Sequence, residues 1–225
     1  MISFHNIAKG SNHMVRFLHV ATGTRVEFPA FITEFSDKIS VSWGTEQIFG
    51  RMDPIKPYQG TTRSISLGFD VVAPSLEIAK ENMTNYSKLV QMMYPVYSEP
   101  LAGVNQRGRV IKAPPLIRLQ FLNLIKNNSP EAQEQGLLGC INGFNFNPDR
   151  NVAGFYSEKE ELFPKVFNIS FNFEPQHETP LGFEHNKFIT PNFPYGRQDT
   201  QGEASTTSTT NPDVAAKKES DILGG

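Results

Sequence analysis

Strict alternation of apolar and polar residues marks two segments of the chain as β-strands. In residues 63–71 the apolar residues occupy every second position: Ile65, Leu67, Phe69 and Val71. Residues 164–173 alternate in the same way, with Phe167, Ile169, Phe171 and Phe173 in phase. Because successive side chains of a strand point to opposite faces of a sheet, each segment is expected to bury one face and to present a small, polar second face.

Weaker patterns of the same kind surround these two segments. Further strands are predicted over residues 13–20, 25–35, 39–43, 116–122 and 136–146. Pro29 marks a bend or an edge in the second of them, and Asp37-Lys38 is expected to form a turn that makes a short hairpin with residues 39–43. Gly139 and Gly143 lie inside the last one, which indicates a β-bulge or a close approach of another backbone.

One segment has helical rather than strand periodicity. Residues 75–94 follow Pro74, begin at a capping residue, Ser75, and end before Pro95. The apolar residues at helical spacing are Leu76, Ala79, Met83, Tyr86, Leu89, Val90 and Met93. This is an amphipathic helix expected to lie on a sheet. The predicted fold is therefore mainly β, an antiparallel β-sandwich or partly closed barrel with one covering α-helix.

Composition and charge narrow the possible functions. The chain has 225 residues, 38% of them hydrophobic, which suffices for a sizeable core. Its net charge of −2 provides no basic field for tight non-specific binding of nucleic acid. Its single cysteine, Cys140, excludes an internal disulfide framework and a cysteine-based zinc site, and is expected to be a small buried residue. No apolar stretch has the length of a membrane span or of a signal peptide, so we expect a soluble protein made in the cytoplasm.

The C-terminal residues differ in composition from the rest. Residues 1–190 carry all the predicted strands and form the expected β domain. Residues 191–225 are rich in Thr, Ser, Gly and Asp and include the low-complexity run Thr206-Thr-Ser-Thr-Thr210. Such a tail cannot bury enough apolar surface to order itself, so we expect it to become ordered only through contacts with partners.

Motifs of known catalytic and metal chemistry are missing from the sequence. It has no nucleophile elbow, phosphate-binding loop or helical zinc motif. Among its five histidines, His177 follows Glu174 at a metal-like spacing, but Pro175 lies between them and favours a surface histidine. The sequence predicts no enzyme, no catalytic residue, no metal site and no cofactor.

Several ordered segments resemble one family of phage proteins. The segments are Phe49-Gly-Arg-Met-Asp-Pro-Ile55, Thr61–Val71, Ser75–Pro95, Ala113–Phe121, Gly136–Pro148, Phe163–Phe173 and Leu181-Gly-Phe183. Over about residues 28–183 the chain is similar to the tail-tube initiator and tube-junction proteins in the baseplates of long-tailed phages, mainly contractile ones.

The resemblance implies a tail-tube-like fold and a structural role in the virion. Six copies would form a ring between the baseplate hub and the tail tube, continue the DNA channel and template assembly of the tube. The implied partners are five further copies, adjacent tail-tube and hub proteins, and DNA as a transient cargo, with no membrane. The implied location is the tail or baseplate of the virion, after synthesis in the host cytoplasm.

The resemblance also points to candidate assembly residues. Arg51 and Asp53 lie in the family-like elbow, where Arg51 is expected to pair with an acid or a carbonyl group, across subunits or in an internal turn with Asp53. The basic segment with Arg107, Arg109 and Lys112 is a candidate contact between rings, with a solvated loop tip as the alternative.

Candidate lumen residues come from the polar face of residues 63–71. Ser64, Ser66 and Asp70 are expected to face the channel. The opposite orientation stays open, because a shift of one residue in register exchanges the two faces of a strand.

A second hypothesis belongs to a different class of function. The chain is then a monomeric β-sandwich module that binds carbohydrate or protein on a virion or cell surface. Such a module predicts a concave site lined by exposed aromatic residues, for which the sequence supplies one Trp and six Tyr. A ring instead predicts strand addition between chains.

Overall fold

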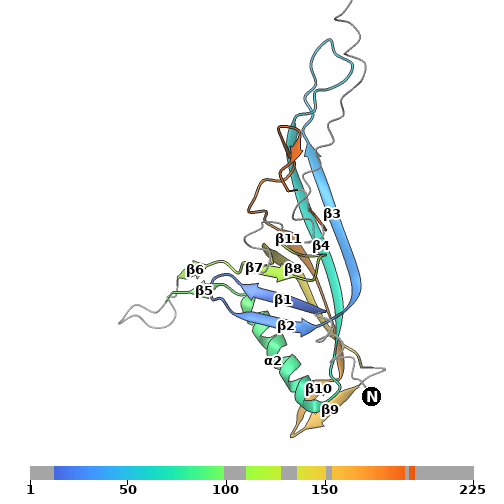
Figure 1. The fold of residues 1–225 in the computed structure, drawn as a ribbon, viewed down its shortest axis with the longest axis vertical. Helices are drawn as coiled ribbons and strands as arrows, with labels where there is room; N and C mark the ends of the chain where they lie inside the picture. The colour runs from blue at the N-terminus through green and yellow to red at the C-terminus, as the bar shows by residue number, and fades with distance from the viewer. Residues whose placement is uncertain (1–12, 99–109, 128–135, 151–153, 191–192, 196–225) are drawn as a thin grey trace, which may run out of the picture.

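A single antiparallel sheet of seven strands forms the centre of the protein. The structure is a computed structural model and describes residues 13–98, 110–127, 136–150, 154–190 and 193–195. The strand order is β2-β1-β7-β8-β11-β4-β3 (Figure 1). The bounds are β1 Met14–His19, β2 Arg25–Pro29, β3 Phe31–Trp43, β4 Tyr58–Val72, β7 Ile117–Gln120, β8 Leu137–Pro148 and β11 Val166–Pro175.

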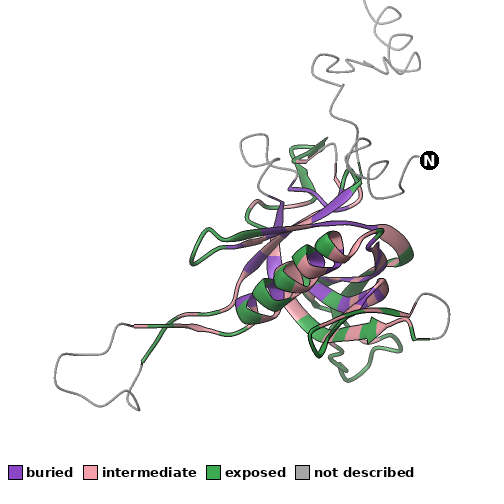
Figure 2. Cartoon of the chain, turned by 90° about the horizontal axis from the view of Figure 1, so that it is seen from below, coloured by how far each residue is buried: buried purple, intermediate pink, exposed green. Residues whose placement is uncertain are grey.

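Three small two-stranded sheets project from this centre. They pair β5 Val96–Tyr97 with β6 Ile111–Ala113, β9 Phe155–Glu158 with β10 Glu161–Pro164, and β12 Phe183–Glu184 with β13 Lys187–Phe188. Figure 2 shows exposed and intermediate positions along the β5–β6 ribbon, while buried positions gather where the helix meets the sheet.

The helix α2, Leu76–Met92, covers part of the sheet. The Ser75 hydroxyl accepts a hydrogen bond from the Ile78 amide at 3.4 Å, which satisfies one of the amides that a helix start leaves open. Leu89 and Met92 are buried against the sheet, and Tyr86 stacks on Phe146 with 4.3 Å between ring centroids. The prediction of a mainly β, antiparallel fold with one covering helix is confirmed for the described residues.

The sheet is open, and it folds over on itself. In the described part of the chain, β2 and β3 are the outer strands, so the sheet does not close into a barrel. The two outer strands follow each other directly, joined at Ala30. Phe28 of β2 lies 6.2 Å from Phe69 of β4, centroid to centroid, and Phe17 of β1 lies 5.7 Å from Phe171 of β11. The core therefore lies between two halves of one bent sheet, not between two separate sheets.

The long strand β3 corrects one prediction. Asp37 and Lys38 form no turn: β3 runs through them for 13 residues and pairs with β4 as far as Trp43 and Tyr58. The reason is that β4 has 15 residues and offers a continuous partner. A tertiary partner thus outweighs the local turn preference of Asp37-Lys38.

The two glycines of β8 have the roles that the sequence predicts. A Cβ on Gly139 would stand 2.4 Å from the Glu174 carbonyl oxygen, so the β11 backbone passes too closely for any side chain. Gly143 has φ of 62°, and the register with β11 shifts opposite it, between Ser170 and Asn172, which is a β-bulge.

Cys140 between those glycines corrects another prediction. Its side chain is partly exposed, and its Sγ lies 3.8 Å from Nε2 of Gln176. It is therefore not a core residue, because alternation along β8 places its side chain on the face of the sheet opposite the core.

Within the described residues, α2 has neither the length nor the apolarity of a membrane-spanning helix.

Candidate functional site

A broad polar face covers the side of β8, β11, β4 and β3 that points away from the core. Opposite residues in the register share this face: Asn168 and Asp70, Ser170 and Gly68, Asn172 and Ser66, and, in the next pair of strands, Ser36 and Ser66. Asn145 and Asn147 of β8 extend it. The alternate positions, such as Phe69 and Phe171, are buried. The predicted division of residues 63–71 into an apolar and a polar face is confirmed.

Hydrogen bonds join the side chains of this polar face across the strands. The Ser66 hydroxyl donates to Oδ1 of Asn172 at 2.7 Å. The amide of Asn168 donates to Oδ1 of Asp70 at 2.7 Å and to the Thr33 hydroxyl at 3.2 Å. These bonds hold short side chains close to the sheet, so the polar face presents a low surface of amides and hydroxyls.

The polar face carries few charges, and most of them are negative. Its acidic side chains are Glu34, Asp70 and Glu174, and Lys38 is basic. Arg150 adds a second basic side chain at its margin, where it lines a hollow with Asp70 and Asn168. Glu174 accepts a hydrogen bond from Asn142 at 2.8 Å. A surface of this kind repels phosphate weakly and offers it few cations to hold.

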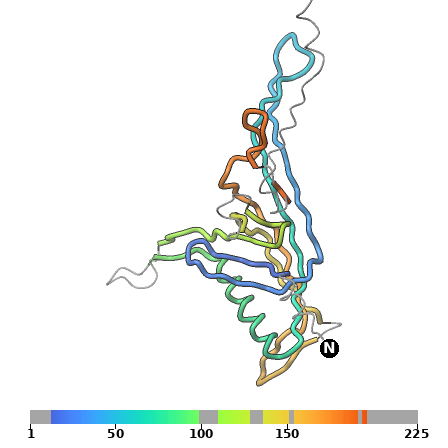
Figure 3. Tube along the Cα trace, viewed as in Figure 1, coloured from blue at the N-terminus to red at the C-terminus, as the bar shows by residue number. Residues whose placement is uncertain are grey.

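The β3–β4 hairpin extends beyond the core as an arm, which we define as residues 39–62. Figure 3 shows its two strands running together past the rest of the sheet. The apolar phase of β3 continues onto the arm, where Ile39, Val41 and Trp43 are exposed. Trp43 and Tyr58 form an edge-to-face pair with centroids 5.6 Å apart.

The predicted assembly residues Arg51 and Asp53 lie at the tip of this arm. Both are exposed, and the described structure forms no ion pair between them. The Arg51 amide donates to the Ile48 carbonyl at 3.2 Å, and Gly50 has φ of 82°, which closes the turn. Their predicted role in assembly stays a prediction.

One of the other predicted assembly residues lies on a different projection. Lys112 is exposed in β6, at the base of the β5–β6 ribbon. Arg107 and Arg109 fall outside the described residues, as does the tail beyond Tyr195. Ser64, Ser66 and Asp70 all lie on the polar face and are partly exposed.

A buried ion pair at the base of the arm was missed by the sequence analysis. Nε and Nη2 of Arg63 donate to the Asp37 carboxylate at 2.9 and 2.7 Å, and the two side chains are only 4% and 6% exposed. The Tyr195 hydroxyl also donates to Asp37, and the Arg63 guanidinium lies 5.1 Å from the centre of the Phe193 ring. These contacts fasten the segment that follows β11 to the arm.

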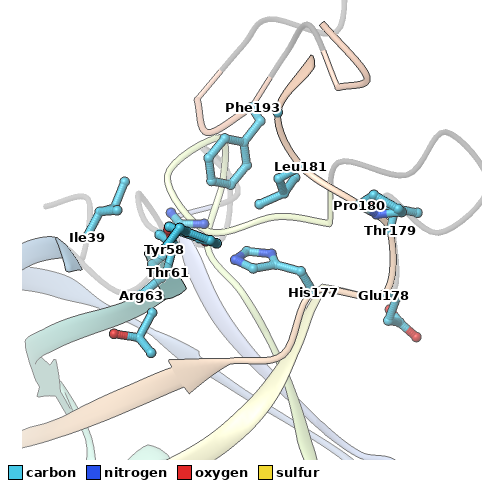
Figure 4. Close-up of a pocket in the computed structure, with 12 residues that line it drawn as sticks. Ile39, Tyr58, Thr61, Arg63, His177, Glu178, Thr179, Pro180, Leu181 and Phe193 are labelled. Atoms are coloured by element: carbon cyan, nitrogen blue, oxygen red, sulfur yellow. The ribbon is translucent and has the colours of Figure 1, made fainter. Parts of the chain in front are cut away.

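A cavity of about 670 Å³ opens beside this ion pair (Figure 4). It lies between the arm on one side and residues 177–182 and Phe193 on the other. Its apolar and aromatic wall residues are Ile39, Tyr58, Pro180, Leu181 and Phe193, and three threonines, Thr61, Thr62 and Thr179, line it with them. His177 also lines it, edge-on to Phe193 at 5.6 Å. His177 is exposed, as the sequence predicts, but it belongs to a cavity wall.

A second ion pair involves Glu178, which also lines the cavity. The guanidinium of Arg118 in β7 donates two hydrogen bonds to the carboxylate of Glu178, at 2.7 and 2.6 Å, and the side-chain amide of Asn127 donates a third at 3.0 Å. The hydrogen bond from Arg118, first of all, holds the pKa of Glu178 below its usual range. Glu178 is thus ionised and paired at neutral pH.

The charges around the cavity shift two further groups. Burial alone would raise the pKa of Asp37, but hydrogen bonds from Arg63 and Tyr195 and the charge of Arg63 outweigh it and lower that pKa. Desolvation at the cavity wall lowers the pKa of His177, and the positive charge of Arg63 lowers it further, against the opposing charge of Asp37. His177 is therefore neutral at neutral pH.

The lowered pKa of His177 predicts a loss of stability on acidification. The unfolded chain takes up a proton near pH 6.5, before the folded chain does, so the free energy of unfolding falls as the pH drops from 7.5 towards 5.5. Urea titrations across this range measure the slope. Burial also lowers the pKa of His19, so His177→Gln is expected to flatten the slope and His177→Gln with His19→Gln to flatten it more. An unchanged slope in His177→Gln would contradict the assignment.

No cluster of three metal-ligating side chains occurs among the residues that the structure describes. The polar face, the arm with its exposed tip and the cavity at the base of the arm are arrangements that can support a function.

Comparison with solved structures yields several similar chains, two of which follow. No family model matches the chain, and no curated protein matches it. A crystal structure of the Dit protein of phage SPP1, described as a paradigm of the hub adsorption apparatus in phages infecting Gram-positive bacteria, has a TM-score of 0.34 and 9% identity over 72% of this chain. The chain spans about half, 49%, of that protein. The six-fold symmetrised baseplate of the anti-feeding prophage includes a chain with a TM-score of 0.30 and 8% identity, covering 71% of this chain and 87% of that one. Both TM-scores lie below 0.5, so neither structure supports an argument about the function of this chain.

Proposed function

We propose that the chain is a structural subunit of a phage tail or baseplate, and that six copies form a ring at the junction of the baseplate hub and the tail tube. In this ring the polar face lines a channel for DNA, and the ring templates the tube. Arg51, Asp53 and Lys112 remain candidate assembly contacts, together with Arg107 and Arg109. The partners are sister copies and the adjacent tube and hub proteins.

The observation that carries the proposal is the contrast between the two sides of the sheet. One side holds the buried core, and the other is a polar face, rich in amides and hydroxyls, that spans four strands. A wall needs this division, with packed protein behind it and water in front. Ser64, Ser66 and Asp70 then face the channel.

The charge of the polar face supports a passage rather than a binding site for DNA. Tight binding to DNA comes from Lys and Arg side chains that neutralise phosphates and release counterions. The basic side chains of the polar face are Lys38 and, at its margin, Arg150, against the three carboxylates of Glu34, Asp70 and Glu174. DNA that travels along such a wall is not held by it.

The open edges of the sheet support assembly from sister copies. In the described part of the chain, no strand pairs with the outer edge of β2 or of the 13-residue strand β3. Long open edges are sites where another chain adds a strand. In a closed ring each copy covers the edge of the next, so that no edge is left.

Native mass spectrometry and electron microscopy of the purified chain test the proposal. We expect a species of six chains of 25.2 kDa each, seen as a ring with a central channel. A symmetry-resolved map is expected to place Ser64, Ser66 and Asp70 on the channel wall. A monomer at every concentration, with and without its tube and hub partners, would contradict the proposal. A ring with the helix α2 facing the channel would contradict the assignment of the polar face.

A further inference from the structure

The tip of the arm presents two large apolar side chains to solvent. Phe49 is 105% exposed relative to a reference residue, and Met52 is 91% exposed. The turn that carries them is well built, since the Glu46–Ile55 bridge and the bond from the Gly44 amide to the Pro57 carbonyl hold its base. Ile48 and Ile55 beside them are exposed as well, and an apolar patch of this kind marks a contact surface.

The cavity at the base of the arm suits an uncharged, apolar occupant. Its volume of about 670 Å³ lies within the ordinary range of binding pockets, roughly 300–1,000 Å³. Its two charged neighbours are already neutralised, Arg63 by Asp37 and Glu178 by Arg118. His177 is held in its neutral form. Tyr58, Phe193 and Leu181 are the wall residues that an apolar occupant would contact (Figure 4).

The tip cannot enter the cavity of its own chain. The cavity wall extends along the ladder of β3 and β4 from Ile39 as far as Tyr58, which pairs with Trp43. The Glu46–Ile55 bridge lies farther out, with the tip beyond it. Each residue of a strand adds about 3.4 Å, so Phe49 could fold back only by breaking this ladder. An occupant that carries Phe49 must come from a second copy.

We propose that Phe49 and Met52 of one copy insert into the cavity of the next copy, between its arm and its residues 177–182 and Phe193. Phe49 then packs against the aromatic wall of Tyr58, His177 and Phe193, where edge-to-face contacts add to the burial. The tip of the arm and the cavity lie at different places on the chain. A contact between the tip of one copy and the cavity of the next is therefore heterologous, and it repeats from copy to copy. This inference rests on the proposed ring and names the contact that closes it.

Engineered disulfides test the contact directly. In a Cys140→Ser background, Phe49→Cys and Leu181→Cys are combined in one chain and oxidised under assembly conditions. We expect a ladder of covalent oligomers on a non-reducing gel. When Phe49→Cys and Leu181→Cys are instead carried by separate chains and mixed, the product is expected to stop at dimers. The control pair, Phe49→Cys with Ser87→Cys on the exposed face of α2, is expected to give no ladder.

The outcomes separate this inference from the ring itself. Rings in native mass spectrometry without the ladder would overturn the contact and leave the ring standing. A ladder from open chains or filaments would support the contact and count against the ring. Monomers without any cross-link would overturn both.

Truncation of the tip supplies a second readout. Since Phe49 is fully exposed, Phe49→Ala is expected to leave the circular dichroism and the unfolding midpoint unchanged. It is expected to weaken association by about 30-fold, the loss typical of a central aromatic contact. Leu162→Ala is the matched control, an exposed apolar residue of β10, 64% exposed, and is expected to change association less than about threefold, as most contact residues do. Equal effects of the two variants would contradict the inference.

Discussion

Asp37→Ala is expected to lower the free energy of unfolding by about 3–5 kcal/mol, the usual loss when one partner of a buried ion pair is removed. The cause is the charge that remains. Arg63 is 4% exposed and has its Nε and Nη2 directed at the Asp37 carboxylate. Without Asp37 the guanidinium stays out of water with no countercharge. Urea unfolding at pH 7 measures the loss.

A double variant distinguishes this cause from a simple loss of packing. Asp37→Leu with Arg63→Met removes both charges and keeps apolar volume, and is expected to recover most of the stability. Arg63→Met alone should cost as much as Asp37→Ala, since it strands the carboxylate. A loss below about 1 kcal/mol in Asp37→Ala, the value of a surface ion pair, would show that water reaches this pair in solution.

The same variant separates fold stability from the shape of the cavity. Asp37 also accepts a hydrogen bond from Tyr195, and Arg63 packs on Phe193. In the double variant the fold is restored but these two contacts with the segment after β11 are lost. Assembly through the proposed insertion of Phe49 should therefore stay weak even where stability returns.

The sequence predicted those elements whose local pattern agrees with their surroundings in the fold. Residues 63–71 and 164–173 alternate strictly, and they became the neighbouring strands β4 and β11, with Phe69 opposite Ile169. The helix was predicted by its own period and caps. In each case the local sequence signal and the tertiary environment favour the same structure, so the local signal alone predicted the element.

The strand β3 was misread because its local signal disagrees with its environment. Asp37-Lys38 has turn character, yet both residues lie in the middle of a ladder. In addition, the alternation in the outer half of β3 is not explained by burial, since Ile39, Val41 and Trp43 are exposed on the arm. The length of β3 follows from the length of its partner β4. The residues of β3 taken alone carry no information on that partner.

The candidate site divides in the same way. The polar face followed from the alternation around Ser64, Ser66 and Asp70. The cavity did not, because it joins residues that are far apart in sequence, such as Arg63 and Phe193. One signal was available: Arg63 occupies the apolar phase of its strand, in step with Ile65. A charged residue in that phase indicates a buried partner, which here is Asp37.

Gly139→Ala is expected to lower the free energy of unfolding by about 3 kcal/mol, the upper part of the range for overpacking. The added Cβ would lie 2.4 Å from the Glu174 carbonyl oxygen and 2.7 Å from the Phe173 ring. A side chain can turn away from such a contact, but the Glu174 backbone cannot without parting β8 from β11. Thermal and urea unfolding measure the loss.

Gly60→Ala is the matched control for this substitution. Gly60 lies in β4 with no atom within 4 Å of its would-be Cβ. Alanine there narrows the freedom of the unfolded chain without a clash, so stability should stay equal or rise by up to about 1 kcal/mol. If both alanine variants unfold alike, the backbones of β8 and β11 are not in the close contact described. If only Gly139→Ala loses stability, that contact is confirmed, and with it the two inner strands on which the polar face is built.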